Sequence, residues 1–424
     1  MKDRYKYKDE LENVRLFLVL IFISIAFFAC KRDTLTTSSI TAKELLGNPE
    51  YQAISYGGYR MNSRDIQPSI ADIKEDLEIL SELGLKLIRT YNVHLPHASN
   101  VLRAIEELRT ENAEFEMYVM LGVWINCKNG FTELSKDHSV GSPKNVDEVD
   151  EAVRLTQQHP EIVKIIAVGN EAMVKWAASY YVEPAIILKW VRHIQKLKAN
   201  DELSKDLWVT SSDNFASWGG GSEEYHIPEL DSLIEEVDYI SMHTYPMHDT
   251  HYNPEFWNKE ISNSNGPVET KVDTLITRAI TYARAQYQAI ENYTKTLGID
   301  KPIHIGETGW ASHSSGFYGA NGSRACDEYK QAVYYHKMRS WTDKENISCF
   351  YFEAFDEPWK DASNPNGSEN HFGLFTHDGQ AKYAVWDVVN LLNSKKLTRG
   401  GSTMKKTYDG DVDKLLESVL IPEI

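Results

Sequence analysis

The chain has 424 residues, of which 42% are hydrophobic and 25% are charged, a composition typical of globular proteins and unlike that of disordered chains. Its formal net charge is −17, with 62 acidic residues against 45 basic ones. Because nucleic-acid binding depends on a basic surface that neutralises phosphates, this balance argues against a nucleic-acid partner. The length suffices for two average domains or for one large barrel.

The first thirty residues have the pattern of an export signal. Basic residues precede an uninterrupted apolar run from Leu16 to Ala29, and Cys30 follows directly. A helix of that length spans about 21 Å, short of the ~30 Å hydrocarbon core of a bilayer. The position of Cys30 resembles the lipobox of bacterial lipoproteins, whose cysteine is lipidated after cleavage. We therefore expect residues 1–30 to be a lipoprotein signal peptide, with a plain signal peptide or short anchor as the alternative. The protein is expected to be exported and lipid-anchored to a bacterial membrane.

An alternation of strands and helices follows this signal. Residues 31–50 contain a threonine- and serine-rich stretch and are predicted to form a linker. Beyond them, apolar strand-like runs alternate with segments of helical period, the clearest at 69–84, where apolar residues recur at spacings of three and four. The strand-like runs occupy residues 53–58, 85–91, 115–125, 162–170, 207–212, 237–245, 302–308 and 348–356.

This alternation predicts an α/β fold, a (β/α)8 TIM barrel that forms a single catalytic domain over residues 51–395. Residues 396–424 are expected to follow as a C-terminal tail. A doubly wound open sheet is the alternative, but that fold usually carries a glycine-rich phosphate turn after its first strand. The segment "SYGGYR" at 55–60 lacks the G-x-G-x-x-G spacing, so the barrel is favoured.

Two of the apolar runs lead into a glutamate. Glu171 follows the run at 162–170, and Glu307 lies near the end of "PIHIGETGW" at 302–310. A glutamate is rarely buried unless it is paired, because an unpaired carboxylate is costly to remove from water. Since TIM-barrel active sites form at the C-terminal ends of the strands, we expect the two carboxylates to face one another across the mouth of the barrel.

Two facing carboxylates are what glycoside hydrolysis requires. One holds a proton for the leaving oxygen, and the other is ionised to attack the anomeric carbon or to activate water. Asn170 precedes Glu171 and can donate from its amide to a sugar hydroxyl. Trp310, Trp359 and Tyr56 are candidates for stacking on sugars, with a place in the core as the alternative. Simple ion pairing at the barrel rim is the alternative for each glutamate, but the two together favour catalysis.

The motifs around these residues resemble glycoside hydrolase family 17, the β-1,3-glucanases and glucan transglycosylases. "VGNE" (168–171) and "GETGWAS" (306–312) look like its two catalytic signatures. "YISMHTYP" (239–246) is similar to its sixth strand, and "FYFEAFDEPWK" (350–360) to the eighth strand of its fungal-type members. The resemblance extends over residues 50–390, with the motifs in the family's order.

The resemblance implies a retaining endo-β-1,3-glucan hydrolase in which Glu171 is the general acid/base and Glu307 the nucleophile. A nearby Lys360 would favour the ionised form of Glu307. The implied partners are β-glucan and, through the lipid anchor, a membrane. No cofactor and no metal are expected. Further residues around the reacting sugar are implied to be Tyr91, Tyr245, Glu357 and Lys360.

Three other functions remain open at this stage. A glucanosyltransferase would use the same two glutamates and pass the covalent intermediate to a sugar hydroxyl instead of water, giving elongated products. A non-catalytic glucan-binding lipoprotein would need neither glutamate. A related barrel enzyme acting on β-1,4 linkages would not be expected to carry "ETGW" together with "HTYP".

The remaining signals are interpreted as structural. The run 243–251 contains three histidines and an aspartate, which would allow a metal site, but a loop beside a sugar cleft is the preferred interpretation. The three cysteines beyond residue 30 have no metal or redox spacing. Buried free thiols are expected there, with one disulfide as the alternative.

Overall fold

The computed structural model describes residues 40–260 and 266–423. The expected signal peptide, Cys30 and the first part of the predicted linker lie outside these ranges. No helix within the described part of the chain is both long enough and apolar enough to cross a bilayer.

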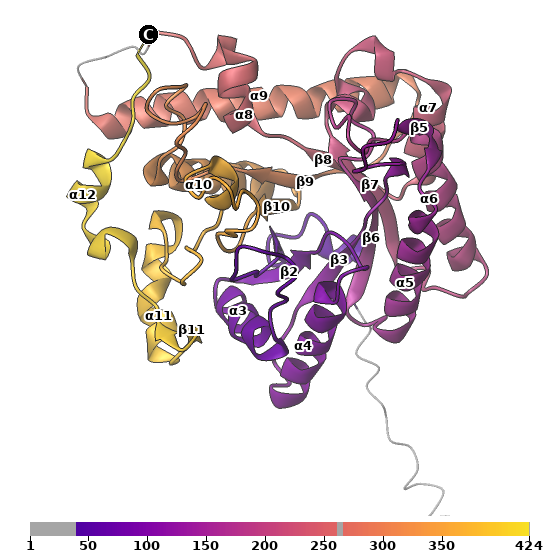
Figure 1. The fold of residues 1–424 in the computed structure, drawn as a ribbon, viewed down its shortest axis with the longest axis horizontal. Helices are drawn as coiled ribbons and strands as arrows, with labels where there is room; N and C mark the ends of the chain where they lie inside the picture. The colour runs from indigo at the N-terminus through magenta and orange to yellow at the C-terminus, as the bar shows by residue number, and fades with distance from the viewer. Residues whose placement is uncertain (1–39, 261–265, 424) are drawn as a thin grey trace, which may run out of the picture. The chain divides into compact units, whose positions relative to one another are not determined.

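Eight parallel strands close into a barrel in the order β1-β10-β9-β8-β7-β6-β3-β2 (Figure 1). Each overlaps one of the apolar runs identified in the sequence, so the predicted TIM barrel is confirmed. The runs could be recognised because helices cover the outside of such a barrel and side chains fill its interior, which leaves parallel strands apolar on both faces. The strands are β1 (Gln52–Ser55), β2 (Leu85–Arg89), β3 (Tyr118–Val123), β6 (Val163–Asn170), β7 (Trp208–Asn214), β8 (Ile240–His243), β9 (Ile303–Gly309) and β10 (Cys349–Phe352).

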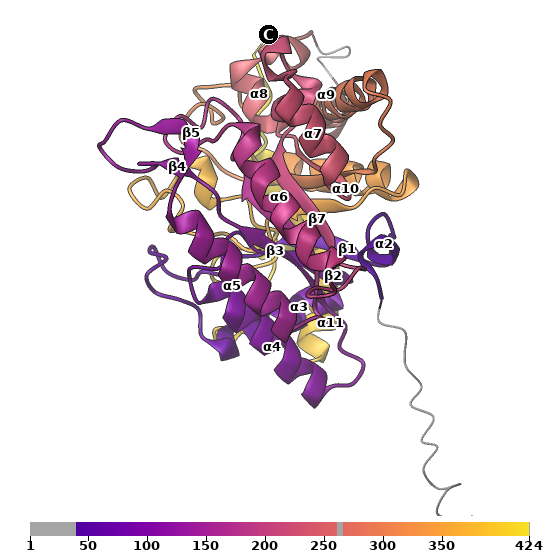
Figure 2. The ribbon, with the colours of Figure 1, turned by 90° about the vertical axis from the view of Figure 1, so that its right-hand side faces the viewer.

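Helices follow the strands and cover the outside of the barrel (Figures 1 and 2). The predicted helix at 69–84 is α3, and its start is fixed by a capping box in which Ser69 and Asp72 exchange side-chain to backbone hydrogen bonds. The helices are α2 (Ala42–Leu45), α3 (Ile70–Glu82), α4 (His97–Glu111), α5 (Lys144–Gln158), α6 (Pro184–Ala199), α7 (Pro228–Glu236), α8 (Pro246–Tyr252), α9 (Val268–Thr296), α10 (Glu328–Lys344), α11 (Val389–Ser394) and α12 (Val412–Glu417).

The larger of two apolar clusters contains residues from both the strands and the surrounding helices. The three cysteines of the described residues belong to it, and all three are buried with free thiols. The interpretation as buried thiols is therefore confirmed. They are Cys127, Cys326 and Cys349.

The last residues of the predicted linker are part of the barrel's packing, which corrects the boundary at residue 50. The short helix α2 places Ala42 and Leu46 in the smaller apolar cluster, together with strand residues such as Leu87 and Met120. Ala42 of α2 and Leu46, which directly follows the helix, are both less than a tenth exposed. The threonine-rich composition upstream hid this segment, because four helical residues are too few to show a period.

The C-terminal segment after residue 395 is likewise packed against the barrel. It contains a two-stranded sheet, β11 (Thr398–Arg399) and β12 (Ser402–Thr403), before α12. Arg399 Nε lies 2.9 Å from Asp76 Oδ1 of α3, and both side chains are buried. Further along, the N–H of Leu420 donates to Asp327 Oδ2 at 3.1 Å. This segment therefore has a structural role on the flank of the domain.

A short antiparallel hairpin interrupts the regular alternation between β3 and α5. It consists of β4 (Cys127–Lys128) and β5 (Asp137–Gly141), and Figure 2 shows it extending from the barrel near α6. The N–H of Cys127 donates to the carbonyl of Tyr180 at 3.0 Å. The hairpin therefore adjoins the loop that follows Glu171.

Candidate active site

Glu307 lies within β9, near the C-terminal end of the strand, and its side chain is 9% exposed. Its Oε2 accepts hydrogen bonds from Arg89 Nη1 at 2.8 Å and from the Tyr91 hydroxyl at 2.7 Å. Its Oε1 accepts from the Tyr245 hydroxyl at 2.7 Å. A buried carboxylate with several donors around it is held in one orientation and is stabilised in its ionised form.

The electrostatics of Glu307 follow from these partners. Burial by itself raises the pKa of Glu307, but His243, Arg89 and the hydroxyls of Tyr91 and Tyr245 outweigh it and hold the pKa below its ordinary value. Glu307 is therefore ionised at neutral pH in spite of its burial. An ionised, oriented carboxylate is what a nucleophile requires.

The cation paired directly with Glu307 is Arg89, whereas Lys360 interacts with Glu307 through its charge without a direct ion pair. The ammonium group of Lys360 lies 3.5 Å from Glu357 Oε2 and 3.6 Å from Glu353 Oε2, and makes its ion pairs with them. Glu357 is otherwise held by the N–H of Tyr59 at 3.0 Å. Lys360 and Glu357 thus form a buried pair of their own in the cavity that Glu307 also lines.

Glu171 follows β6 in an unusual backbone conformation, with a φ of +45°, and the φ of Gly169 just before it is +88°. A β-carbon on Gly169 would lie 3.0 Å from the Ala172 Cβ, so glycine suits this turn both sterically and conformationally. The Glu171 side chain is 25% exposed, and its Oε1 lies 3.1 Å from His243 Nδ1. The turn thereby directs Glu171 toward the end of β8.

His243 connects the two glutamates. Its Nδ1 lies 3.1 Å from Glu171 Oε1 and 4.0 Å from Glu307 Oε1. The two oxygens are therefore separated by no more than the sum of these distances. Carboxyl groups are ~5–5.5 Å apart in retaining glycosidases and ~6.5–9.5 Å apart in inverting ones. The bound on this pair of oxygens is compatible with the separation found in retaining enzymes.

Asn170 is the last residue of β6, directly before Glu171, and contacts Arg89. Its Oδ1 accepts from Arg89 Nη2 at 2.6 Å. That contact orients the amide and leaves its N–H groups without a protein partner among the described residues. The amide is therefore available to donate to a sugar hydroxyl, as expected from the sequence.

A cavity of about 980 Å³ lies beside Glu307, a size typical of small-ligand sites. Tyr245 reaches the same carboxylate through its hydroxyl. Tyr56 is fully buried, and its hydroxyl donates to Asp76 at 3.2 Å. It therefore lines the cavity without presenting an exposed ring. The cavity is lined by the predicted residues Tyr56, Tyr91, Asn170, Glu307, Glu357, Trp359 and Lys360.

Trp310 is a core residue, so its interpretation as a sugar-stacking residue is wrong. It is 0% exposed, and its indole N–H donates to the carbonyl of Ala325 at 2.8 Å. Its ring packs against Trp257 and Tyr334, with centroids 5.8 and 4.9 Å away. Trp359, in contrast, lines the cavity, and the guanidinium of Arg64 lies 4.3 Å from its ring centroid.

Two residues at the centre of the site, Arg89 and His243, were not proposed from the sequence as catalytic-site partners. Arg89 ends β2 and His243 ends β8, and both are almost fully buried. A polar residue that ends an apolar run is the same signal that identified Glu171. A search of every predicted strand for such a residue would have identified both Arg89 and His243.

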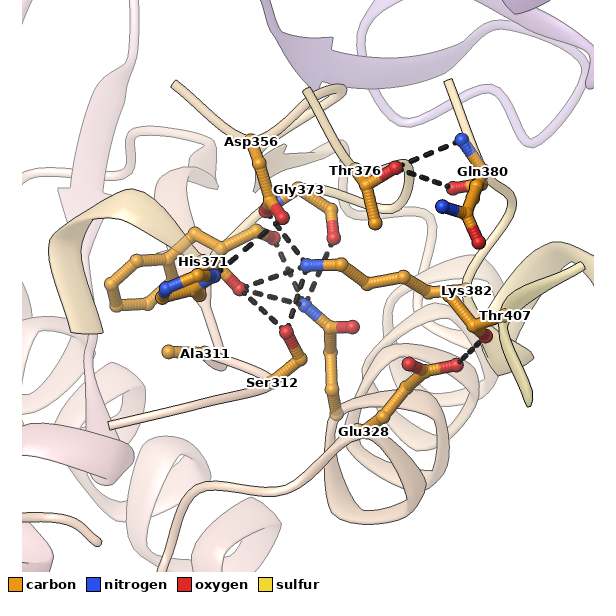
Figure 3. A network of polar contacts seen from close by, with 12 residues as sticks. Ala311, Ser312, Glu328, Asp356, His371, Gly373, Thr376, Gln380, Lys382 and Thr407 are labelled. Carbon is orange, nitrogen blue, oxygen red and sulfur yellow. Dashed lines mark hydrogen bonds and ion pairs between the residues drawn. The ribbon is translucent and has the colours of Figure 1, made fainter. Parts of the chain in front are cut away.

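A buried polar network supports the loops that follow β9 and β10 (Figure 3). The ammonium group of Lys382 donates to Asp356 Oδ1 at 2.7 Å, to Ser312 Oγ at 2.8 Å and to the carbonyl of His371 at 3.1 Å. Gln331 of α10 donates to the carbonyls of neighbouring residues in the same loops. The network fixes the segments that continue from the strand carrying Glu307.

The described residues contain no group of three or more histidine, cysteine or acidic side chains placed to hold a metal ion. In the run 243–251, His243 is directed to Glu171, whereas the His248 ring stacks on Tyr245 with centroids 5.1 Å apart. The His251 ring stacks on Phe317 at 4.2 Å. His243 therefore faces the glutamates, whereas His248 and His251 pack among aromatic rings and share Tyr318 as a neighbour.

Comparison with known proteins agrees with this geometry. Residues 53–373 match the model of the BtgE/BtgC glycoside hydrolase domain. The crystal structure of an endo-laminarinase from Formosa Hel1_33_131 is 58% identical, with a TM-score of 0.89, and covers 91% of this chain and 99% of that one. A protein of Arthroderma benhamiae named glucan 1,3-beta-glucosidase is 26% identical over 330 residues, 76% of this chain and 86% of its own length.

A third relative shares the fold. An active-site mutant of Rhizomucor miehei β-1,3-glucanosyltransferase, in complex with laminaritriose, is 21% identical with a TM-score of 0.53, and covers 79% of this chain and 97% of that one. The family match covers most of the chain, and the Formosa structure matches nearly all of it. The chain therefore belongs to the BtgE/BtgC glycoside hydrolase domain family, is a glycoside hydrolase, and is related to the family 17 β-1,3-glucanases and glucanosyltransferases.

Proposed function

We propose that this glycoside hydrolase cleaves internal linkages of β-1,3-glucan with retention of configuration, using Glu307 as the nucleophile and Glu171 as the general acid/base. The observation that carries the proposal is the contrast between the two carboxylates. Glu307 is buried and held ionised by Arg89, Tyr91 and Tyr245, whereas Glu171 is a quarter exposed and has one histidine contact.

The two carboxylates can then divide the reaction into two steps. In the first, a Glu307 oxygen attacks the anomeric carbon while the bond to the leaving oxygen breaks and Glu171 gives that oxygen its proton. In the second, Glu171 takes a proton from water, and the hydroxide formed displaces Glu307 from the anomeric carbon. The buried donors around Glu307 stabilise the carboxylate that leaves in this second step.

The proposed substrate rests on the relatives. The Formosa protein, 58% identical over nearly the whole chain, is an endo-laminarinase, and the Arthroderma protein is named for β-1,3-linked glucan. The cavity beside Glu307 offers aromatic and hydroxyl side chains together with the amide of Asn170. Those groups suit a neutral sugar with apolar faces and equatorial hydroxyls.

The test is to incubate the protein with a soluble linear β-1,3-glucan and to resolve the products by size and anomer. The wild type is expected to release short oligosaccharides that are initially of β configuration. Glu307→Ala should lower the rate at least a thousandfold. Products of α configuration would refute retention, and products longer than the substrate would identify a glucanosyltransferase that uses the same residues. Binding without any change in the glucan would favour a binding protein.

We also propose that the protein is exported and anchored through a lipid on Cys30. The basic start of the chain, the apolar run from Leu16 to Ala29 and the cysteine directly after it support this. Metabolic labelling with a radioactive fatty acid should mark the wild type and leave Cys30→Ser unlabelled. Equal labelling of both would refute the anchor.

A further inference from the structure

We propose that Trp124, Phe131 and Tyr180 form a stacking site for a glucosyl unit of the β-glucan chain, apart from the unit that reacts. We call these three residues the aromatic wall. The inference rests on the proposed function and deepens it, because it assigns part of the chain-length preference to three named side chains.

The aromatic wall belongs to the cavity that holds the nucleophile. All three side chains line the cavity beside Glu307. The charges of Glu171 and Glu307, after burial, contribute to raising the pKa of the Tyr180 hydroxyl, so this ring is within electrostatic reach of both carboxylates. The wall therefore continues the surface on which the reacting sugar lies.

The three rings pack against one another. The centroids of Phe131 and Tyr180 are 5.1 Å apart with an interplanar angle of 16°, and Trp124 lies 6.2 and 5.4 Å from them. Phe131 nevertheless remains 59% exposed. Leaving a phenylalanine this exposed keeps apolar surface in water, which core packing does not explain.

Backbone hydrogen bonds hold the wall in place from two directions. The hairpin β4–β5 is joined to the loop after Glu171 because the N–H of Phe131 donates to the carbonyl of Ser179 at 3.0 Å. The N–H of Trp124 donates to Glu148 Oε1 of α5, also at 3.0 Å. Phe131 itself has a φ of +58°, uncommon for a residue other than glycine. The hairpin thus presents the ring without burying it.

The ligand expected at the aromatic wall follows from the chemistry of its three rings and from their position in the cavity. A β-linked glucosyl unit carries its hydroxyls equatorially, so its two faces present C–H groups that pack on aromatic rings. A glucan chain cleaved at an internal linkage extends beyond the reacting unit. An exposed aromatic surface in the same cavity as Glu307 is where the extending units can bind.

The experiment compares binding of laminarihexaose, measured by titration calorimetry, to Glu307→Gln and to the same protein carrying Phe131→Ala. The affinity for laminarihexaose is expected to fall on the order of tenfold, the effect of removing one aromatic stacking residue from a protein that binds single-stranded nucleic acid. Phe131→Tyr should retain the affinity because it keeps the ring. Phe317→Ala is the matched control, since Phe317 is 56% exposed and stacked on His251 but does not line the cavity.

The outcomes separate this inference from the proposed function. With otherwise wild-type protein, Phe131→Ala should lower kcat/KM for laminarihexaose more than for laminaritriose, and Phe317→Ala should change neither. Active wild-type protein with equal affinity for laminarihexaose in the Phe131→Ala and control variants would overturn the stacking site and leave the proposed function standing. A wild type that neither binds nor cleaves the oligosaccharide would overturn both.

Discussion

Replacing Arg89 with methionine tests whether Glu307, the proposed nucleophile, owes its ionised state to this arginine. The Arg89 side chain is 1% exposed and donates to Glu307 Oε2 at 2.8 Å, so water cannot readily take its place. A hydrogen bond to a charged group is worth ~1.5–3 kcal/mol. Its loss should lower the ratio of ionised to protonated Glu307 at a given pH about 10- to 150-fold.

The sign of the pH effect follows from the direction of the pKa. Glu307 acts when ionised, so activity is lost as the pH falls through its pKa, which the protein holds below the ordinary value. Without Arg89 the pKa rises, and the acid limb of the profile should move to higher pH. The assay is the pH dependence of kcat/KM on a soluble β-1,3-glucan, which reports the free enzyme.

Two further variants distinguish charge from general damage. Arg89→Lys keeps the charge but cannot bind Glu307 and Asn170 together, so it should lower kcat/KM while leaving the acid limb near that of the wild type. Arg339 is a buried arginine of α10 that donates to the carbonyls of Cys349 and Ala53. Arg339→Met should lower Tm without moving the limb. If Arg89→Met is folded and the acid limb of its pH profile coincides with that of the wild type, the reasoning is refuted.

Three other predictions concern the surroundings of the nucleophile. Tyr245→Phe removes an uncharged donor at 2.7 Å and should move the acid limb of the same profile upward by less than the arginine variant; a downward move would contradict this. Lys382→Met removes the cation paired with the buried Asp356 and should lower the free energy of unfolding, measured by urea titration, by ~3–5 kcal/mol. A loss below about 1 kcal/mol would show that water replaces the lysine. Gly57→Ala places a β-carbon 2.1 Å from Glu357 Oε1 and should lower kcat/KM with little change in Tm, and wild-type activity would show that this carboxylate can move freely.

The sequence was sufficient to predict the barrel because its strands are covered on both faces. The strand β6, for example, is buried at every residue from Val163 to Gly169, and Lys164 is the one charged residue in this otherwise apolar run. Glu171 and Glu307 stood out against such runs, and the barrel rule then placed both at the same end of the sheet. The polar exceptions in apolar strands thus carried most of the functional information.

Other parts of the site depend on neighbours that are distant in sequence. "ETGW" does not tell which way Trp310 points, and the deciding contacts come from Trp257 and Tyr334. Arg89 of β2 reaches Glu307 of β9 through the barrel interior, although β1 and β10 lie between the two strands in the sheet. The aromatic wall forms where the hairpin β4–β5 meets the loop after β6. The hairpin could not be predicted from the sequence, because strands of two to five residues are too short to show a hydrophobic period.

The protonation of His243 links the electrostatics of the two carboxylates. Its Nε2 lies 2.8 Å from Ser212 Oγ and 3.2 Å from Arg89 Nη1. Since arginine is only a donor whereas a serine hydroxyl can donate as well as accept, both contacts are satisfied when Nε2 is the acceptor. The ring proton therefore belongs on Nδ1, where Glu171 Oε1 accepts it at 3.1 Å. In the proposed mechanism, Oε2 of Glu171 is then the oxygen left to carry the proton for the leaving group. In the proposed mechanism the negative charge of Glu307 disappears when this residue becomes covalently bound, and the His243 contact then holds Glu171 in place while it takes a proton from water.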